Sequence, residues 1–285
     1  MNHLQNWSLD LLHLFEIVVN QILGIVENML TTPLNVFAPT AYNLSQALAT
    51  SITGLGTGIF ILLWMIDILS ETITFKIKNW EDAIKHFVIL IFGLGLISSS
   101  FFLLTQMFNI LQWVMNAVQQ AGTDIFGTDQ LSFSYFVAQT REFVEYHNGL
   151  MESILLFLVV LMFLLATFGT MLSILLVPIA IFIQLYMYSA FAPIPMATLL
   201  TSQKQVGIQF LKTYAGVAIQ GALVIFGLML AQAFLSSPIL SFGDSFALES
   251  FARILLPILH LMFNMMVLSK CIKSAGEFGK AITGG

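Results

Sequence analysis

The side chains that could carry proton or metal chemistry are few and scattered. The chain of 285 residues has five histidines and one cysteine, Cys271. No two histidines have the His-Glu-x-x-His spacing that places two imidazoles on one helical face around a zinc ion. A single cysteine also leaves no intrachain disulfide to form. We therefore expect no catalytic residue, no cofactor and no metal site in a protein that is not an enzyme.

One pair of residues superficially matches a nucleotide-binding motif. Gly279-Lys280 resembles the end of a phosphate-binding loop, but Ala281 stands where that loop needs Ser or Thr. Its first glycine is also missing, because position 274 is Ser. The pair therefore predicts no nucleotide site.

A polar row near the C-terminus leaves two interpretations open. Arg253, Pro257, His260 and Asn264 recur at spacings of four, three and four, so they share one helical face within the apolar segment 251–268. Polar groups inside a membrane often mark a pore or a proton relay. They also form hydrogen-bonded contacts between helices. His260 and Asn264 are candidates for either role.

The composition identifies the environment of these residues. Hydrophobic residues make up 58% of the chain and charged residues 9%, whereas a soluble domain has about 25% charged residues. Residues 153–203 contain no Asp, Glu, Lys, Arg or His. At about 1.5 Å per residue this run would form a helix of about 75 Å, against a hydrocarbon core of about 30 Å. The sequence predicts an all-α polytopic membrane protein.

The positions of the lysines and arginines predict the orientation. Spans are expected at 52–69, 87–108, 214–235 and 251–268, and the uncharged run supplies a fifth at about 151–171. The loops then hold 0, 3, 1, 2, 1 and 3 basic residues in chain order. An outside N-terminus and an inside C-terminus place eight of the ten in the cytoplasm, as the positive-inside rule requires. Five crossings are therefore favoured, and six are the alternative.

Three further elements complete the expected layout. Residues 9–30 form an amphipathic helix that lies on the membrane or packs against a partner helix. Its predicted apolar stripe is Leu11, Phe15, Val18, Ile22, Val26 and Met29. The excess length of the uncharged run forms a tilted, interfacial or re-entrant helix, kinked by Pro178. We divide the chain into residues 1–50, the amphipathic helix and a linker, and residues 51–285, the membrane domain, with an extracytoplasmic helical segment at 105–149.

Small and amide residues mark candidate helix contacts. Gly54 and Gly58 have the Gly-x-x-x-Gly spacing, and Gln209, Gly216 and Gln220 follow one stripe of a later span. Such residues let helices approach closely and bond across the contact. We interpret all five as helix-packing or pore-lining candidates, including contacts with other subunits.

Two prolines follow the uncharged run. Pro193 and Pro195 lack a backbone N–H and fix φ, and they bias Ala192 and Ile194 away from the helical conformation. The preceding helix is therefore expected to stop near Phe191. Lys204 and Lys212 follow this turn and would face the anionic inner leaflet or an anionic partner.

The residues around this turn also carry a family resemblance. Residues 184–197 and 207–222 resemble the TrbL/VirB-type polytopic subunit of conjugation and type IV secretion machines, particularly the short forms from Gram-positive mobile elements. In that family an Ala-Pro-x-Pro turn precedes a Gly-x-x-Phe-Leu-Lys entry to a Gln-Gly-containing span. The matching positions are Ala192, Pro193, Pro195, Gly207, Phe210, Leu211, Lys212, Tyr214, Ala215, Gln220 and Gly221. The resemblance covers residues 150–235 best.

The resemblance implies a function. It implies a channel or scaffold subunit of the inner (cytoplasmic) membrane that forms a homo-oligomer around the path of a DNA–protein substrate. The implied partners are membrane lipid, other secretion subunits including cytoplasmic ATPases and, transiently, single-stranded DNA or a relaxase. The turn would be a plain hairpin or a docking site for the ATPase. The alternatives are an ion-coupled secondary transporter, which would need internal repeats that we do not find, and another pore-forming membrane protein.

Overall fold

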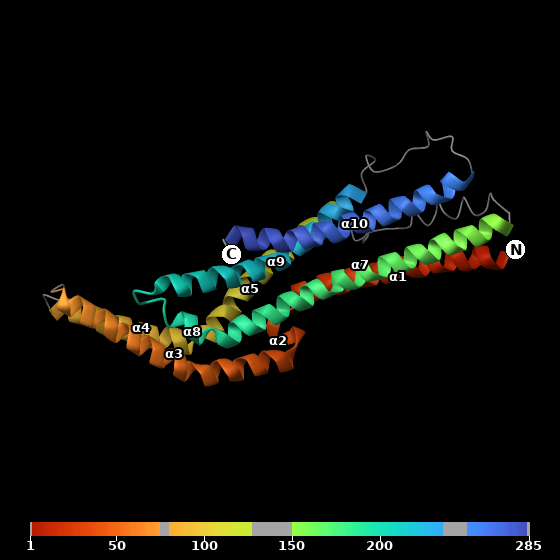
Figure 1. Ribbon diagram of the computed structural model, residues 1–285. Helices are drawn as coiled ribbons and strands as arrows, with labels where there is room; N and C mark the ends of the chain where they lie inside the picture. The colour runs from red at the N-terminus through yellow and green to blue at the C-terminus, as the bar shows by residue number, and fades with distance from the viewer. Residues whose placement is uncertain (1, 75–79, 127–149, 236–249, 284–285) are drawn as a thin grey trace. The chain divides into compact units, whose positions relative to one another are not determined.

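The chain is all-helical in the computed structural model, which describes residues 2–74, 80–126, 150–235 and 250–283 (Figure 1). No strand occurs in these ranges. The helices are α1 (Asn2–Thr31), α2 (Leu34–Phe37), α3 (Pro39–Ile73), α4 (Trp80–Ser98), α5 (Ser100–Phe126), α7 (Leu150–Phe191), α8 (Pro193–Met196), α9 (Lys204–Leu235) and α10 (Ser250–Thr283). Helices satisfy their own backbone groups, as a bilayer demands. The predicted all-α class is confirmed.

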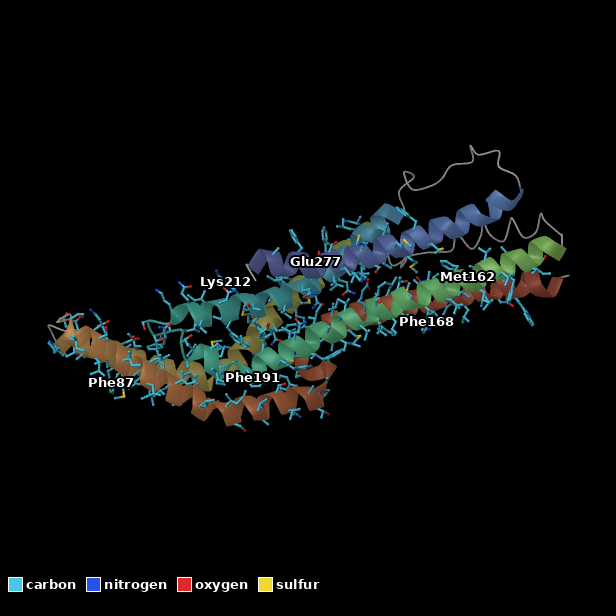
Figure 2. The ribbon with its side chains drawn as sticks, in the orientation of Figure 1. Phe87, Met162, Phe168, Phe191, Lys212 and Glu277 are labelled. Carbon is cyan, nitrogen blue, oxygen red and sulfur yellow. The ribbon has the colours of Figure 1, made fainter. Side chains whose placement is uncertain are left out.

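Five of the helices are long and apolar enough to cross a membrane. They comprise Asn6–Thr31, Pro39–Ile73, Ser100–Ile125, Leu156–Phe191 and Lys204–Leu230. Apolar side chains project outward from α4 and α7, with Phe87, Met162 and Phe168 all more than half exposed (Figure 2). Lipid is the solvent that suits such surfaces. The chain is a multi-pass membrane protein.

This set of spans differs from the predicted one at both ends of the chain. The N-terminal helix belongs to the five. The predicted last span, 251–268, lies in α10, and its side chains up to residue 261 are outside the described part of the chain. The predicted boundary at residue 50 falls inside α3.

The helices form two compact units that share several long helices. One unit contains Met1–Thr31, Met115–Ile179 and Leu223–Gly276, and the other contains Thr32–Val114, Ala180–Ala222 and Glu277–Gly285. We call them the α1 unit and the α3 unit after a long helix that each contains completely.

In the α1 unit, α1 packs against α7, so of the two interpretations of this helix the contact with a partner helix is confirmed. The Phe15 and Phe163 rings meet edge to face, with centroids 4.9 Å apart. The buried stripe is Leu12, Phe15, Val19, Leu23, Val26 and Leu30. It shares Phe15 and Val26 with the predicted stripe, and its other four residues lie one position later, because Leu11 and Leu12 are both apolar and the helical period permits either register.

In the α3 unit, the core lies between α3 and α4. The Phe60 ring lies against Gly93, where a Cβ atom would collide with it. Phe60, Ile97 and Ala197 form a buried cluster. The Tyr214 hydroxyl, fully buried, donates to the Leu104 carbonyl at 2.9 Å and thereby joins α9 to α5.

The predicted span 87–108 is wrong as a single helix. The chain ends α4 at Ser98, starts α5 at Ser100 and changes direction there (Figure 1). The Ser99 hydroxyl donates to the Gly95 carbonyl at 2.7 Å, and the Ser98 hydroxyl donates to Leu94 at 2.8 Å. Serine hydroxyls that compete for helix carbonyls bend helices, and the hydroxyls of Ser98 and Ser99 do so in succession. Helix α5 then continues through residues 105–126 of the segment predicted to be extracytoplasmic, and 127–149 lie outside the described residues.

The separate re-entrant helix is also wrong. Residues 150–191 form one continuous helix of 42 residues, with Pro178 inside it. At about 1.5 Å per residue its length is about 63 Å. A proline removes one helical hydrogen bond. A full break would free more backbone N–H and C=O groups, and apolar surroundings offer these groups no other hydrogen-bond partner, so the helix continues.

Candidate functional site

The proline turn, which we define as residues 192–203, follows α7 directly. Helix α7 ends at Phe191, as predicted, but the expected departure of Ala192 from the helical region is wrong. Ala192 has φ −52° and ψ −37°, and Pro193 opens the short helix α8. A proline in the first turn of a helix lacks only an N–H that has no acceptor there. The prolines therefore redirect the helix and start a new one.

Although it connects two long helices, the proline turn is largely buried in its first half, whereas Leu200, Ser202 and Gln203 are exposed. Ala192 and Ala197 are fully buried, and Met196 is 3% exposed. Burial of a connecting segment requires partners for its polar groups. Two hydroxyls supply some of them, since Thr198 Oγ1 donates to the Pro195 carbonyl at 2.8 Å and Thr201 Oγ1 donates to the Thr198 carbonyl at 2.9 Å. The segment is thus a defined structural element.

Two glycines let neighbouring helices reach the turn. A Cβ atom on Gly56 of α3 would lie 2.6 Å from the Pro193 carbonyl oxygen. A Cβ atom on Gly207 of α9 would lie 2.8 Å from the Pro195 oxygen. Real Cβ atoms do not approach this closely. Gly207 was among the predicted site residues, whereas Gly56 was not.

A polar row on α3 fixes the far end of the turn. Asp67 Oδ2 accepts a hydrogen bond from the Ser202 backbone N–H at 2.9 Å. On the same face, Trp64 Nε1 donates to the His86 carbonyl at 3.0 Å, and Glu71 Oε2 lies 2.9 Å from His86 Nε2. These three α3 residues hold α4 and the proline turn at the same end of α3.

The prolines of the turn and the residues of α7 and α9 beside it form two groups, one packed and one exposed. The Tyr188 ring of α7 contacts Phe210 and Tyr214 edge to face, with centroids 5.7 Å and 6.5 Å away. Pro193 is buried and Pro195 is partly buried. Lys204 and Lys212 are exposed, and Lys212 projects from α9 (Figure 2). The arrangement is a rigid junction with cations beside it.

Two predicted packing residues are in contact with another helix. A Cβ atom on Gly279 of α10 would lie 3.2 Å from Gln220 Cβ and 3.3 Å from the Gly216 carbonyl oxygen. Gly216 and Gln220 therefore pack against α10. Gly279, which resembled part of a phosphate loop, has a packing role in this contact.

The other predicted candidates lie elsewhere. A Cβ atom on Gly54 or Gly58 would meet nothing within 4 Å, and both residues are exposed. Gln209 is exposed, and its carbonyl accepts a hydrogen bond from the Thr213 hydroxyl at 2.9 Å. His260 and Asn264 are on α10, and their side chains lie outside the described part of the structure. The candidate residues thus do not form one site.

Neither metal chemistry nor similarity to known proteins adds to this picture. In the ranges that the structure describes, no three His, Cys, Asp or Glu residues are grouped to hold a metal ion. No family model, no curated protein and no solved structure matches the chain. The TrbL/VirB resemblance therefore remains a prediction that rests on residues 184–222.

Proposed function

We propose that this chain is a channel or scaffold subunit of a conjugative type IV secretion system in the cytoplasmic membrane. The observation that carries the proposal is the proline turn, because its first half is largely buried and Gly56 and Gly207 let two neighbouring helices contact it closely. The residues with the family resemblance thus coincide with a defined junction between α7 and α9. A chance resemblance between two apolar sequences would not require the resembling residues to lie at such a junction.

The contacts of Asp67 support the proposed orientation. The bond from Ser202 to Asp67 brings the turn, and hence Lys204, to the C-terminal end of α3. Lys76 and Lys78 follow that end in the sequence. Basic residues gathered at one end favour the cytoplasmic side. This arrangement supports an even number of crossings between the two lysine groups, both of which we place in the cytoplasm.

The proposed assembly is a homo-oligomer around a translocation path. Exposed Gly54 and Gly58 allow another helix to approach α3 closely. The chain would do no chemistry itself, and cytoplasmic ATPases on other chains would supply the work. A relaxase with its single-stranded DNA, or a protein, would be the substrate, in transient contact with the subunit.

A transfer assay tests the proposal. Deletion of the gene from its host should abolish conjugative transfer of the element that carries it, and the wild-type gene should restore it. Gly56→Leu should not restore transfer, because the turn no longer fits, whereas Gly169→Leu should, because Gly169 faces open space on α7. Affinity purification from native membranes should recover a cytoplasmic ATPase. Unchanged transfer after deletion would contradict the proposal.

A further inference from the structure

His86 of α4 and Glu71 of α3 form a pair that the proposed function has not used. His86 Nε2 lies 2.9 Å from Glu71 Oε2, and the His86 side chain is 14% exposed, whereas the Glu71 side chain is 44% exposed. A carboxylate can only accept a hydrogen bond, so Nε2 is the donor. The pair therefore joins the two helices whether the imidazole ring is neutral or charged, and its strength depends on which form is present.

The charged groups around this pair come from the elements that pack against α4. Helix α4 contacts α3 and α8, and α8 has no charged residue. The charged residues of α3, α4 and the start of α9 in this region are Asp67, Glu71, Glu81, Asp82, Lys85 and Lys204. Lys85 is paired with Asp82 at 3.1 Å, and Lys204 is exposed. Lys76 and Lys78 lie outside the described residues. Among the residues that the structure describes, Glu71 is therefore the charged partner of the imidazole ring.

Protonation changes the strength of the pair. Histidine is the side chain that ordinarily changes charge between about pH 5 and 8. A charged ring adds the attraction of opposite charges to its hydrogen bond with a carboxylate, whereas a neutral ring keeps the hydrogen bond alone. The pair thus stabilises the contact between α3 and α4 most at the acid end of this range, and this stabilisation is lost as the pH rises. Water screens the half-exposed Glu71 carboxylate, so the change is modest.

The proline turn lies against both helices that the pair joins. Helix α8 contacts α3 and α4, and Ala197 of the turn belongs to the buried cluster with Phe60 of α3 and Ile97 of α4. A Cβ atom on Gly56 would collide with the Pro193 carbonyl oxygen, so this region has no spare room. Close-packed interiors transmit small displacements. A change in the contact between α3 and α4 therefore changes the support of the turn.

One face of α3 holds both the pair and the far end of the turn. Trp64, Asp67 and Glu71 follow one another at spacings of three and four, so they share this face. Trp64 Nε1 donates to the His86 carbonyl at 3.0 Å, and Asp67 Oδ2 accepts from the Ser202 N–H at 2.9 Å. The two residues that bind His86 thus stand on either side of the residue that binds the turn.

We propose that the His86–Glu71 pair is a proton-operated latch on the proline turn, closed when His86 is charged and loosened when it is neutral. The latch goes beyond the proposed function and does not rest on it, because all of its contacts lie in the α3 unit. On the proposed orientation this end of α3 faces the cytoplasm, so the turn loosens as the cytoplasmic pH rises.

Hydrogen exchange in the full chain in lipid nanodiscs tests the latch, with both membrane faces at the same pH. The protection factor of the Ser202 amide, which compares intrinsic and observed exchange rates at each pH, should fall on the order of fivefold from about pH 5 to 8. His86→Gln should show the low value throughout. His86→Lys, whose side chain stays charged across this range, should show the high value throughout. The matched control is His13→Gln, which removes the histidine of a His–Glu pair on α1 and should titrate like the wild type.

Two outcomes would overturn the latch. The first is a Ser202 protection factor that stays constant across this pH range in the wild type, a measurement that needs no variant to fold. The second is a pH dependence that survives in His86→Gln, since another group would then be the sensor. Retained helical circular dichroism identifies the variants that fold. Neither measurement involves conjugative transfer, so the latch and the proposed function can fail separately.

Discussion

Gly56 is the residue on which the contact between α3 and the proline turn depends. Gly56→Ala adds a Cβ atom 2.6 Å from the Pro193 oxygen, so either the turn or α3 must move. We expect a loss of about 1–3 kcal/mol, the usual cost of overpacking. It should appear as a lower thermal midpoint in detergent. Gly54→Ala, which meets open space, is the matched control, and equal midpoints for both variants would contradict the contact.

Asp67 supports the turn through a single hydrogen bond. Asp67→Leu removes the acceptor of the Ser202 N–H, so hydrogen exchange at Ser202 should become faster. Asp67→Asn keeps an acceptor oxygen and should leave exchange close to wild type. Asp82→Asn, which affects a carboxylate paired with Lys85 instead, serves as the control. Unaltered exchange in Asp67→Leu would remove Asp67 from the site.

The glycines show how far residue types alone can identify a site. The Gly-x-x-x-Gly spacing selects Gly54 and Gly58, but the contact uses Gly56, which lies between them. Two residues correspond to about 200° around a helix, so Gly56 is on the opposite side. The glycine cluster was visible in the sequence. Which face turns inward depends on the position of α8, which no local pattern encodes.

At the scale of elements, α3 and α4 pair through Phe60 and Gly93. Gly93→Ala should destabilise the pair, because the new methyl group overlaps the Phe60 ring. Phe60→Leu in the same chain should recover part of the loss, a coupling that a double-mutant cycle measures through thermal midpoints. Gly95→Ala, in open space on α4, should instead stabilise by up to about 1 kcal/mol through helix propensity. Strictly additive effects of Gly93→Ala and Phe60→Leu would disprove the contact.

Some helix ends can be predicted from the sequence and others cannot. The end of α7 follows from Pro193 and Pro195, because a proline acts on its own backbone and that of the preceding residue. The break between α4 and α5 has no such local cause. Serines such as Ser98 and Ser99 bend a helix only when packing favours the bend, as the contact between Tyr214 and Leu104 does here. The helix class was therefore predictable, whereas the number of helices in residues 87–126 was not.

For the whole molecule, the orientation in the membrane depends on which side of the membrane the proline turn lies. A cysteine at Lys204 in the Cys271→Ala background should react with an impermeant reagent in inside-out vesicles and stay unlabelled in intact cells. This result follows from the shared end of α3 that the Asp67–Ser202 bond defines. A cysteine at Lys85 should behave in the same way, as the control on α4. Opposite behaviour of the two positions would exclude the arrangement.

The length of α7 has a consequence for biosynthesis. A helix of about 63 Å fits a core of about 30 Å only if tilted by about 60°, beyond the observed range of about 0–40°, so part of α7 must be sheathed by protein. In the α1 unit, α1 provides such a sheath through Phe15 and Phe163. The ribosome completes α1 long before it reaches Leu150. Until then the apolar stripe of α1 lacks its partner, so the packing of α1 against α7 is a late step in the synthesis of the chain.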